Sequence, residues 1–114
     1  MAPDHTVSGK FDLLLTGATV LDPSQDLHDL VDVGVAGGRI AAVGHDLQGE
    51  ARQQIDLSGC LLTPGWIDIH AHVYAGATTW GVSADALCLA TGVTTIVDAG
   101  SPGWASLPGF VDYI

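Results

Sequence analysis

The stretch "TPGWIDIHAH", residues 63–72, decides the fold, because the character of the chain changes here. Pro64 and Gly65 open a short apolar run that predicts a β-strand, and alternate residues of a strand share a face. This period of two gives two sets: Trp66, Asp68, His70 and His72 on one face, and Ile67, Ile69 and Ala71 on the other. The second set is what a parallel strand presents to a covering helix. The first set therefore places a carboxylate and two imidazoles on the other face of the sheet.

The residues that follow predict a βαβ unit. "SADALCLATG" predicts a helix, with Ser83 as its N-cap and Gly92 as its C-cap. "VTTIVDAG" at residues 93–100 predicts a second strand. Two strands joined by a crossover helix pair in parallel. The last residues, 110–114, predict the start of another helix.

The segment before Pro64 has a different pattern, typical of short strands and glycine-rich turns. We expect a flexible tail at residues 1–10, an antiparallel β unit at residues 11–62, and the βαβ region from residue 63 to residue 114. This order of elements predicts an α/β chain in two parts.

Within the β unit, residues 11–22 predict two short strands separated by a turn at Gly17, and residues 23–29 predict a loop. Valines then alternate with small or polar residues up to Gly37-Gly38, which can adopt the positive φ angles of a tight hairpin. Residues 52–59 predict one further strand.

Composition and charge exclude several classes of function. The chain has 114 residues, 47% of them hydrophobic, and a formal net charge of −10 from thirteen acidic and three basic residues. Such a chain repels phosphate backbones and anionic lipid, so we expect no nucleic-acid or membrane partner. No apolar run approaches a membrane span or a signal peptide, which predicts a cytoplasmic protein. Cys60 and Cys88 are too few for a disulfide framework and are interpreted as small buried residues.

The histidine pair predicts a metal site. Imidazoles at positions i and i+2 of a strand can converge on one divalent cation, for which neutral imidazole is a preferred ligand. Asp68 lies on the same face and could help to orient them. The competing interpretation is two half-exposed strand histidines without a ligand, which would be preferred for an isolated pair. Here the pair falls toward the C-terminal end of a parallel strand, where sites form in α/β folds.

Residues 64–72, "PGWIDIHAH", resemble the PGxIDxHxH signature of the amidohydrolase superfamily. "GVTTIVDAGSPG" at residues 92–103 is most similar to its amidohydrolase/deacetylase branch, with dihydroorotases as neighbours. These are metal-dependent hydrolases built on a (β/α)8 TIM-like barrel beside a small β-sandwich. The resemblance implies that residues 11–62 are an N-terminal part of the composite β-sandwich. It implies that residues 63–114 begin the barrel, with the architecture cut short after its first βα unit.

The same resemblance implies the site and its chemistry. His70 and His72 would be the first-strand metal ligands, with Asp68 in a supporting position behind them. The cofactor would be zinc or another divalent metal, with one or two ions in the complete enzyme. The reaction would be hydrolysis, by metal-activated water, of a C–N amide bond or an acetyl ester in a small molecule.

The family's other site residues are a lysine, two further histidines and a catalytic aspartate on later strands, and these strands are missing. We therefore assign no catalytic residue and expect the segment to be inactive alone. Lys10 precedes the sandwich, and the remaining histidines are expected to be solvated: His5, His28 and His45. Asp98 is assigned to capping the turn before Gly100, and the tryptophans are assigned to packing.

Three alternatives stay open to different degrees. The parent protein could be a dihydroorotase or another cyclic amidohydrolase instead of a deacetylase. The short chain could be a non-catalytic metal-binding or partner-binding module. A small structural domain with incidental histidines is the third, and the two motifs argue against it. A homo-oligomer is compatible with all of these.

Overall fold

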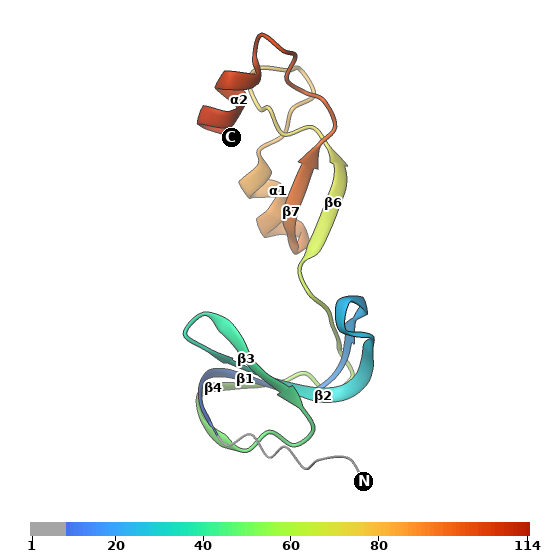
Figure 1. Cartoon of the computed structure of the whole chain (residues 1–114), viewed down its shortest axis with the longest axis vertical. Coiled ribbons are helices and arrows are strands. Elements are labelled where there is room, and N and C mark those ends of the chain that lie inside the picture. Colours follow the sequence, from blue (N-terminus) through green and yellow to red (C-terminus); the bar gives the residue numbers. More distant parts are fainter. Residues whose placement is uncertain (1–8) are drawn as a thin grey trace. The chain divides into compact units, whose positions relative to one another are not determined.

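The computed structural model describes residues 9–114, which form two compact units that divide between Pro64 and Gly65 (Figure 1). Most of the predicted tail, residues 1–8, lies outside the described residues. Its last two residues, Gly9 and Lys10, are already part of the first strand, because the long strand β1 pairs with a neighbour from Gly9 onward.

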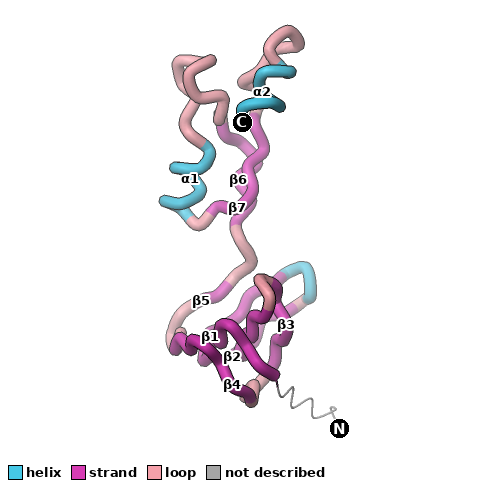
Figure 2. The backbone as a smooth tube through the Cα atoms, turned by 90° about the vertical axis from the view of Figure 1, so that its left-hand side faces the viewer, coloured by secondary structure: helices cyan, strands magenta, loops and turns pink. Residues whose placement is uncertain are grey.

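The first unit is a mixed β-sheet built around β1 (Figures 1 and 2). Strand order is β3-β2-β1-β4, and the short β5 also pairs with β1. The elements of this unit are β1 (Gly9–Asp22), a 3-10 helix η1 (Pro23–Gln25), β2 (Leu27–Ala36), β3 (Arg39–Gly44), β4 (Gly49–Asp56) and β5 (Leu61–Leu62).

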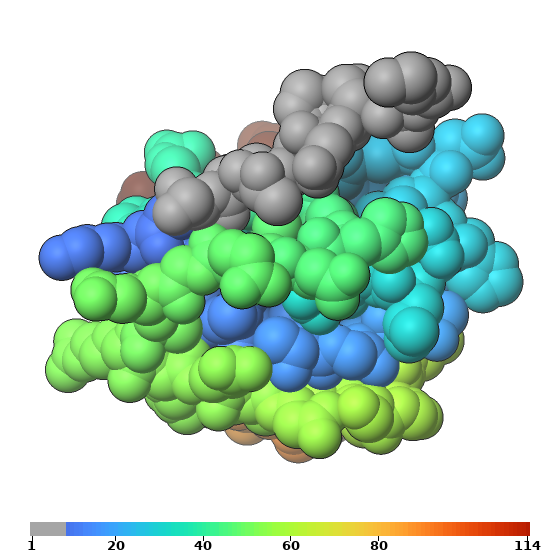
Figure 3. Space-filling model, turned by 90° about the horizontal axis from the view of Figure 1, so that it is seen from below, coloured from blue at the N-terminus to red at the C-terminus, as the bar shows by residue number. Residues whose placement is uncertain are grey.

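The predicted all-antiparallel pairing of this unit is wrong in part. β1, β2 and β3 do pair antiparallel, whereas β4 and β5 run parallel to β1. The physical reason is the link after β3, which does not extend the hairpin. Its Leu47 is buried with Phe11, Leu14 and Ala42, and the Leu47 N–H donates to the Asp32 carboxylate at 3.1 Å. In Figure 3 the segment after β3 (green) lies over β1 (blue).

The predicted turn at Gly17 is instead a bulge inside one continuous strand. The register of β1 against β2 shifts between Leu15 and Ala18. Gly17 has φ 73°, and its N–H donates to the Asp32 carboxylate at 3.1 Å. A glycine at positive φ accommodates the extra residue without breaking the strand.

The hairpin at Gly37-Gly38 is confirmed. Both glycines have positive φ, 59° and 72°, and Ala36 pairs with Arg39 on either side of them. The Gly37 N–H also donates to the Asp12 carboxylate at 2.7 Å, which ties the hairpin to β1. A second core cluster is formed by residues of β1 and β2, namely Ala18, Val20, Val31 and Val33.

The second unit confirms the predicted strand, helix and parallel strand. Its elements are β6 (Trp66–Ala71), α1 (Ala84–Thr91), β7 (Val93–Asp98) and α2 (Leu107–Tyr113). β6 and β7 pair in parallel, and Figure 1 shows α1 beside them. The Ser83 hydroxyl accepts the N–H of Ala86 at 3.4 Å, and α1 ends at Gly92 as predicted. The predicted C-terminal helix begins three residues earlier than expected, at Leu107.

Apolar side chains of the second unit are extensively exposed. Ile67 and Ile69, expected beneath a covering helix, are 61% and 76% exposed. A single helix of eight residues covers too little of a two-stranded sheet to bury them. Cys60, predicted to be buried, is exposed because it lies in the turn between β4 and β5.

Among residues 9–114, neither α-helix is long and apolar enough to cross a membrane.

Candidate metal centre

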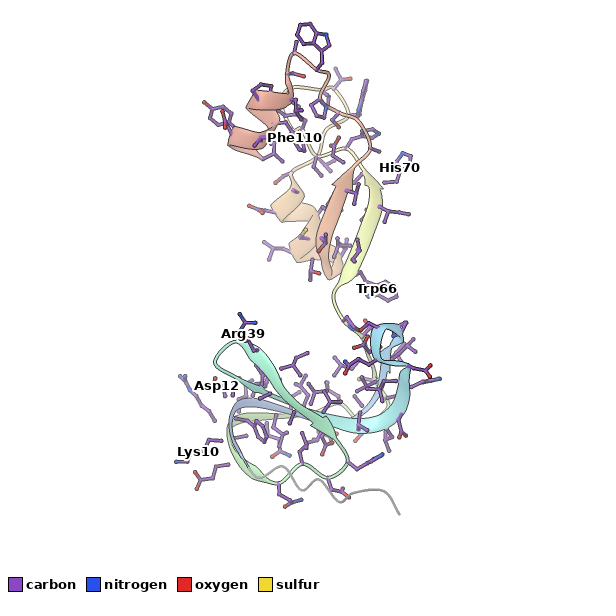
Figure 4. The ribbon with its side chains drawn as sticks, viewed as in Figure 1. Lys10, Asp12, Arg39, Trp66, His70 and Phe110 are labelled. Atoms are coloured by element: carbon purple, nitrogen blue, oxygen red, sulfur yellow. The ribbon has the colours of Figure 1, made fainter. Side chains whose placement is uncertain are left out.

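His70 and His72 lie where the two parallel strands end. His70 is near the last residue of β6, and His72 follows that strand directly. The Ala99 N–H, just after β7, donates to the Ala71 carbonyl at 2.8 Å, so the ends of both strands are joined here. Figure 4 shows His70 projecting outward from the end of β6. Both histidines are therefore at the carboxyl edge of the sheet, the edge at which sites form in α/β folds.

The two imidazole rings lie next to each other. Their centroids are 5.9 Å apart and their planes make an angle of 81°. His70 is exposed and His72 is half-buried, so a cation in solvent can reach the pair. At this separation one nitrogen from each ring can approach a shared cation after small side-chain rotations.

His72 is the more firmly held of the two. Its carbonyl accepts the N–H of Val82 at 2.9 Å, and its Nδ1 is 3.0 Å from the Ser101 hydroxyl. The Trp80 ring packs edge-on against the imidazole, with centroids 6.1 Å apart and planes at 76°. Trp80 is 64% exposed and belongs to neither core cluster of the described residues.

Asp68 contacts the site through the backbone. Its carboxylate accepts the backbone N–H of His70 at 2.9 Å, and among the described residues no imidazole donates a hydrogen bond to it. The register of β6 against β7 is irregular between Asp68 and Ala71. Asp68 thus shapes the strand on which His70 is carried, a short-range side chain–backbone interaction typical of aspartate.

Asp98 connects the ends of β6 and β7. Its carboxylate accepts the N–H groups of Val73 and Gly100, each at 2.9 Å, and that of Ser101. The predicted cap before Gly100 is confirmed, and the bond to Val73 extends it to the residue after His72. Burial raises the pKa of the Asp98 carboxyl, but hydrogen bonds from Val73, Ser101 and Gly100 outweigh it and lower the pKa to about 2. Asp98 is therefore ionised at neutral pH.

The two imidazoles supply only part of a zinc site. Within residues 9–114, no three His, Cys, Asp or Glu side chains are grouped closely enough to hold a metal ion. Catalytic zinc is usually bound by three protein ligands, so the two imidazoles fit such a centre as a part of it.

The other histidines and Lys10 are remote from the pair along the chain. His28 is exposed in β2 and not in a loop as predicted, whereas His45 lies in the turn after β3, 3.3 Å from the Asp29 carboxylate. Lys10 makes an exposed ion pair with Glu50 at 3.6 Å, and His5 lies outside the described residues.

Ser101 and Trp80 are the contacts of His72 that the sequence did not predict. The signal for Ser101 is its place in the turn after β7, three residues beyond Asp98. That signal is weak, because the position of Ser101 in the turn does not predict which side chain its hydroxyl contacts.

Comparison with known proteins gives consistent results. No family model matches the chain. In sequence it is similar to a deacetylase of Agrobacterium fabrum, with 45% identity over 85 residues. It is also similar to an allantoinase of Rubrobacter xylanophilus, with 46% identity over 88 residues. These matches cover 73% and 75% of this chain but only 21% and 19% of the two relatives, so the chain spans a small part of their length.

Solved structures agree. A crystal structure of a dihydroorotase matches 90% of this chain and 27% of its own, with a TM-score of 0.73 and 36% identity. An N-acyl-D-glutamate deacylase from Bordetella bronchiseptica, complexed with zinc and a phosphonate inhibitor, matches 77% of this chain and 18% of its own. Its TM-score is 0.59 and its identity 33%.

Proposed function

We infer that this chain, which belongs to the amidohydrolase superfamily, contributes His70 and His72 as two ligands of a divalent-metal centre in a hydrolase. The observation that carries this proposal is the pair of imidazoles 5.9 Å apart at the joined ends of β6 and β7. It is supported by the zinc complex of the related deacylase. Zinc or a similar divalent ion is the proposed cofactor.

A bound divalent ion would supply Lewis-acid activation of water and of the carbonyl under attack. The residues of this chain prepare the position of the ion. His70 and His72 offer neutral nitrogen donors from one strand end, and Asp68 fixes the backbone beneath His70 through its 2.9 Å hydrogen bond. Because only unprotonated imidazoles bind metal, protons compete with the cation for these nitrogens.

The proposed reaction is hydrolysis of a C–N amide bond, or of an acetyl ester, in a small molecule. Similarity to the Bordetella N-acyl-D-glutamate deacylase favours an acyl group on an amine, and similarity to the Agrobacterium deacetylase is compatible with it. A cyclic amide is the second candidate, favoured by the allantoinase and the dihydroorotase. The two candidates are distinguished by measuring whether a protein that contains this chain hydrolyses N-acetylated amino acids or cyclic ureides and amides.

We propose that the 114-residue chain alone does not catalyse this reaction. Two imidazoles leave the centre short of ligands, and an exposed strand end does not exclude water from the reacting groups. Metal binding without catalysis is also what we would expect if the chain were a non-catalytic metal-binding module. That alternative is supported if longer proteins containing this chain bind zinc at the pair but hydrolyse neither class of substrate.

The proposal is tested by zinc binding to the 114-residue chain, measured by equilibrium dialysis with elemental analysis. We expect weak binding near one equivalent, lost in both His70→Ala and His72→Ala. His28→Ala is the matched control, because His28 is an exposed strand histidine in the first unit. Equal zinc in the two site variants and the control would contradict the proposal. Hydrolysis of N-acetyl substrates that depends on His70 would contradict the inactivity of the chain alone.

A further inference from the structure

We propose that Ser101 is a positioning residue for His72. Its hydroxyl accepts the Nδ1–H of the imidazole, fixes one tautomer and leaves Nε2 free as the donor for a cation. The choice of tautomer and the use of Nε2 as a metal ligand both rest on the proposed function, whereas the contact between Ser101 and His72 does not.

The contact joins two parts of the chain that are far apart in sequence. Ser101 Oγ is 3.0 Å from His72 Nδ1, across a separation of 29 residues. Both side chains are half-buried, so water competes less for this hydrogen bond than it would at an exposed pair. When one imidazole nitrogen is hydrogen-bonded to a protein group, only the other nitrogen is available to bind a metal.

The backbone on both sides of the contact is fixed by one carboxylate. Asp98 accepts the N–H of Val73, next to His72, through Oδ2, and the N–H of Ser101 through Oδ1. The Ala71 carbonyl, on the other side of His72, accepts the N–H of Ala99 at 2.8 Å. The histidine and the serine are therefore presented to each other by main-chain hydrogen bonds that do not involve the Ser101 hydroxyl.

The direction of the hydrogen bond follows from what a bound cation requires. A hydroxyl and a neutral ring nitrogen can bond in either direction. If the hydroxyl donated to Nδ1, the ring proton would be on Nε2 and neither ring nitrogen would keep a lone pair for a metal. If Nδ1 donates to the hydroxyl, Nε2 keeps its lone pair. The proposed metal site therefore requires His72 with its proton on Nδ1 and its lone pair on Nε2.

His70 provides an internal contrast. Its ring is exposed, and within the described part of the chain no side chain hydrogen-bonds to it, because Asp68 bonds to its backbone instead. Removing the Ser101 hydroxyl should change His72 and leave the tautomers of His70 unaltered.

The first test reads the tautomer in the metal-free 114-residue chain. Long-range ¹H–¹⁵N spectra of ¹⁵N-histidine protein, assigned with His70→Ala and His72→Ala, should show His72 as the Nδ1–H form at pH 8. Ser101→Ala should give a mixture of tautomers at His72 only, and Ser101→Thr, which keeps the hydroxyl, should restore the single form. An Nε2–H form in the unaltered chain, or an unchanged His72 in Ser101→Ala, would overturn the proposal.

A matched control comes from the first unit. Ser58 is a comparable serine, because its N–H donates to the carboxylate of a nearby aspartate, Asp56, at 2.9 Å, as the N–H of Ser101 does to Asp98. Ser58→Ala should leave every histidine spectrum unchanged. Should Ser101→Ala unfold the region, Ser101→Cys takes its place, since sulfur is a similar-sized but weak hydrogen-bonding group.

The second test measures zinc affinity by competition with a chromophoric chelator. Loss of a residue that orients a ligand weakens metal binding by about 10- to 100-fold, and we expect Ser101→Ala near the lower value, with recovery in Ser101→Thr. If His72→Ala binds zinc as well as the unaltered chain, the metal-site proposal fails. The tautomer result then still decides the role of Ser101. If His72 is needed for zinc but Ser101→Ala binds equally well with an unchanged tautomer, only the positioning role fails.

Discussion

At the scale of single residues, the Asp98 side chain holds the ends of β6 and β7 together. Its carboxylate accepts three backbone N–H groups from both sides of the site. These bonds, against the opposing effect of burial, hold its pKa at about 2. Because the pKa is lower in the folded chain than its ordinary value of about 3.9, the ionised form stabilises the fold above about pH 4. This contribution is lost as the pH falls from about 4 to about 2.

We therefore predict that the backbone amides of Val73 and Ser101 lose protection from hydrogen exchange between about pH 4 and pH 2, following the lowered pKa of Asp98. Asp98→Asn should weaken this protection at pH 7 and make it nearly independent of pH in that window. Asp85→Asn, which neutralises an exposed carboxyl on α1, is the control for net charge. A titration of Asp98 with a midpoint near 4 would contradict the prediction.

At the scale of elements, the bulge in β1 is the feature most sensitive to one side chain. A Cβ at Gly17 would meet the Ser58 hydroxyl at 2.6 Å, and the residue has φ 73°, where other L-residues are strained. We predict that Gly17→Ala lowers the free energy of unfolding of the first unit by about 1–2 kcal/mol or more, from the backbone strain and the clash.

The measurement is urea unfolding followed by circular dichroism, with Gly44→Ala as the matched control. Gly44 ends β3 in the same unit, and a Cβ there would meet only Leu47, at an ordinary contact distance of 3.6 Å. The control should change the free energy of unfolding by less than about 0.5 kcal/mol. Equal destabilisation by the two substitutions would mean that the bulge does not require glycine.

At the scale of the whole molecule, exposed apolar surface governs behaviour in solution. In the second unit Ile69, Leu89 and Trp104 are 76%, 89% and 93% exposed, and β6 and β7 form a sheet of only two strands. Uncovered strand edges and apolar patches favour association between chains, even against the net charge of −10. We therefore expect the chain to associate with copies of itself.

We predict that the 114-residue chain self-associates in a concentration-dependent way, measured by size exclusion with light scattering. Ile69→Lys should reduce this association, although it lowers the net negative charge and so weakens the repulsion between chains. Gln48→Lys makes the same change of charge at an exposed polar residue and should not reduce association. A monomer at all concentrations would contradict the prediction.

The sequence by itself determined the features that depend on neighbouring residues. The Gly37-Gly38 hairpin, the ends of α1 at Ser83 and Gly92, and the parallel pairing of β6 with β7 all follow from local conformational preferences and a short crossover. The alternation of residues 66–72 likewise brought His70 and His72 to one strand end.

Only the tertiary structure decided the rest. The parallel pairing of β4 with β1 depends on the burial of Leu47, and the continuity of β1 depends on the bond from Gly17 to Asp32. The hydrogen bond between His72 and Ser101 spans 29 residues. Local preferences act over a few positions of the chain. Such contacts therefore exist only once the strands have paired and Asp98 has joined the ends of β6 and β7.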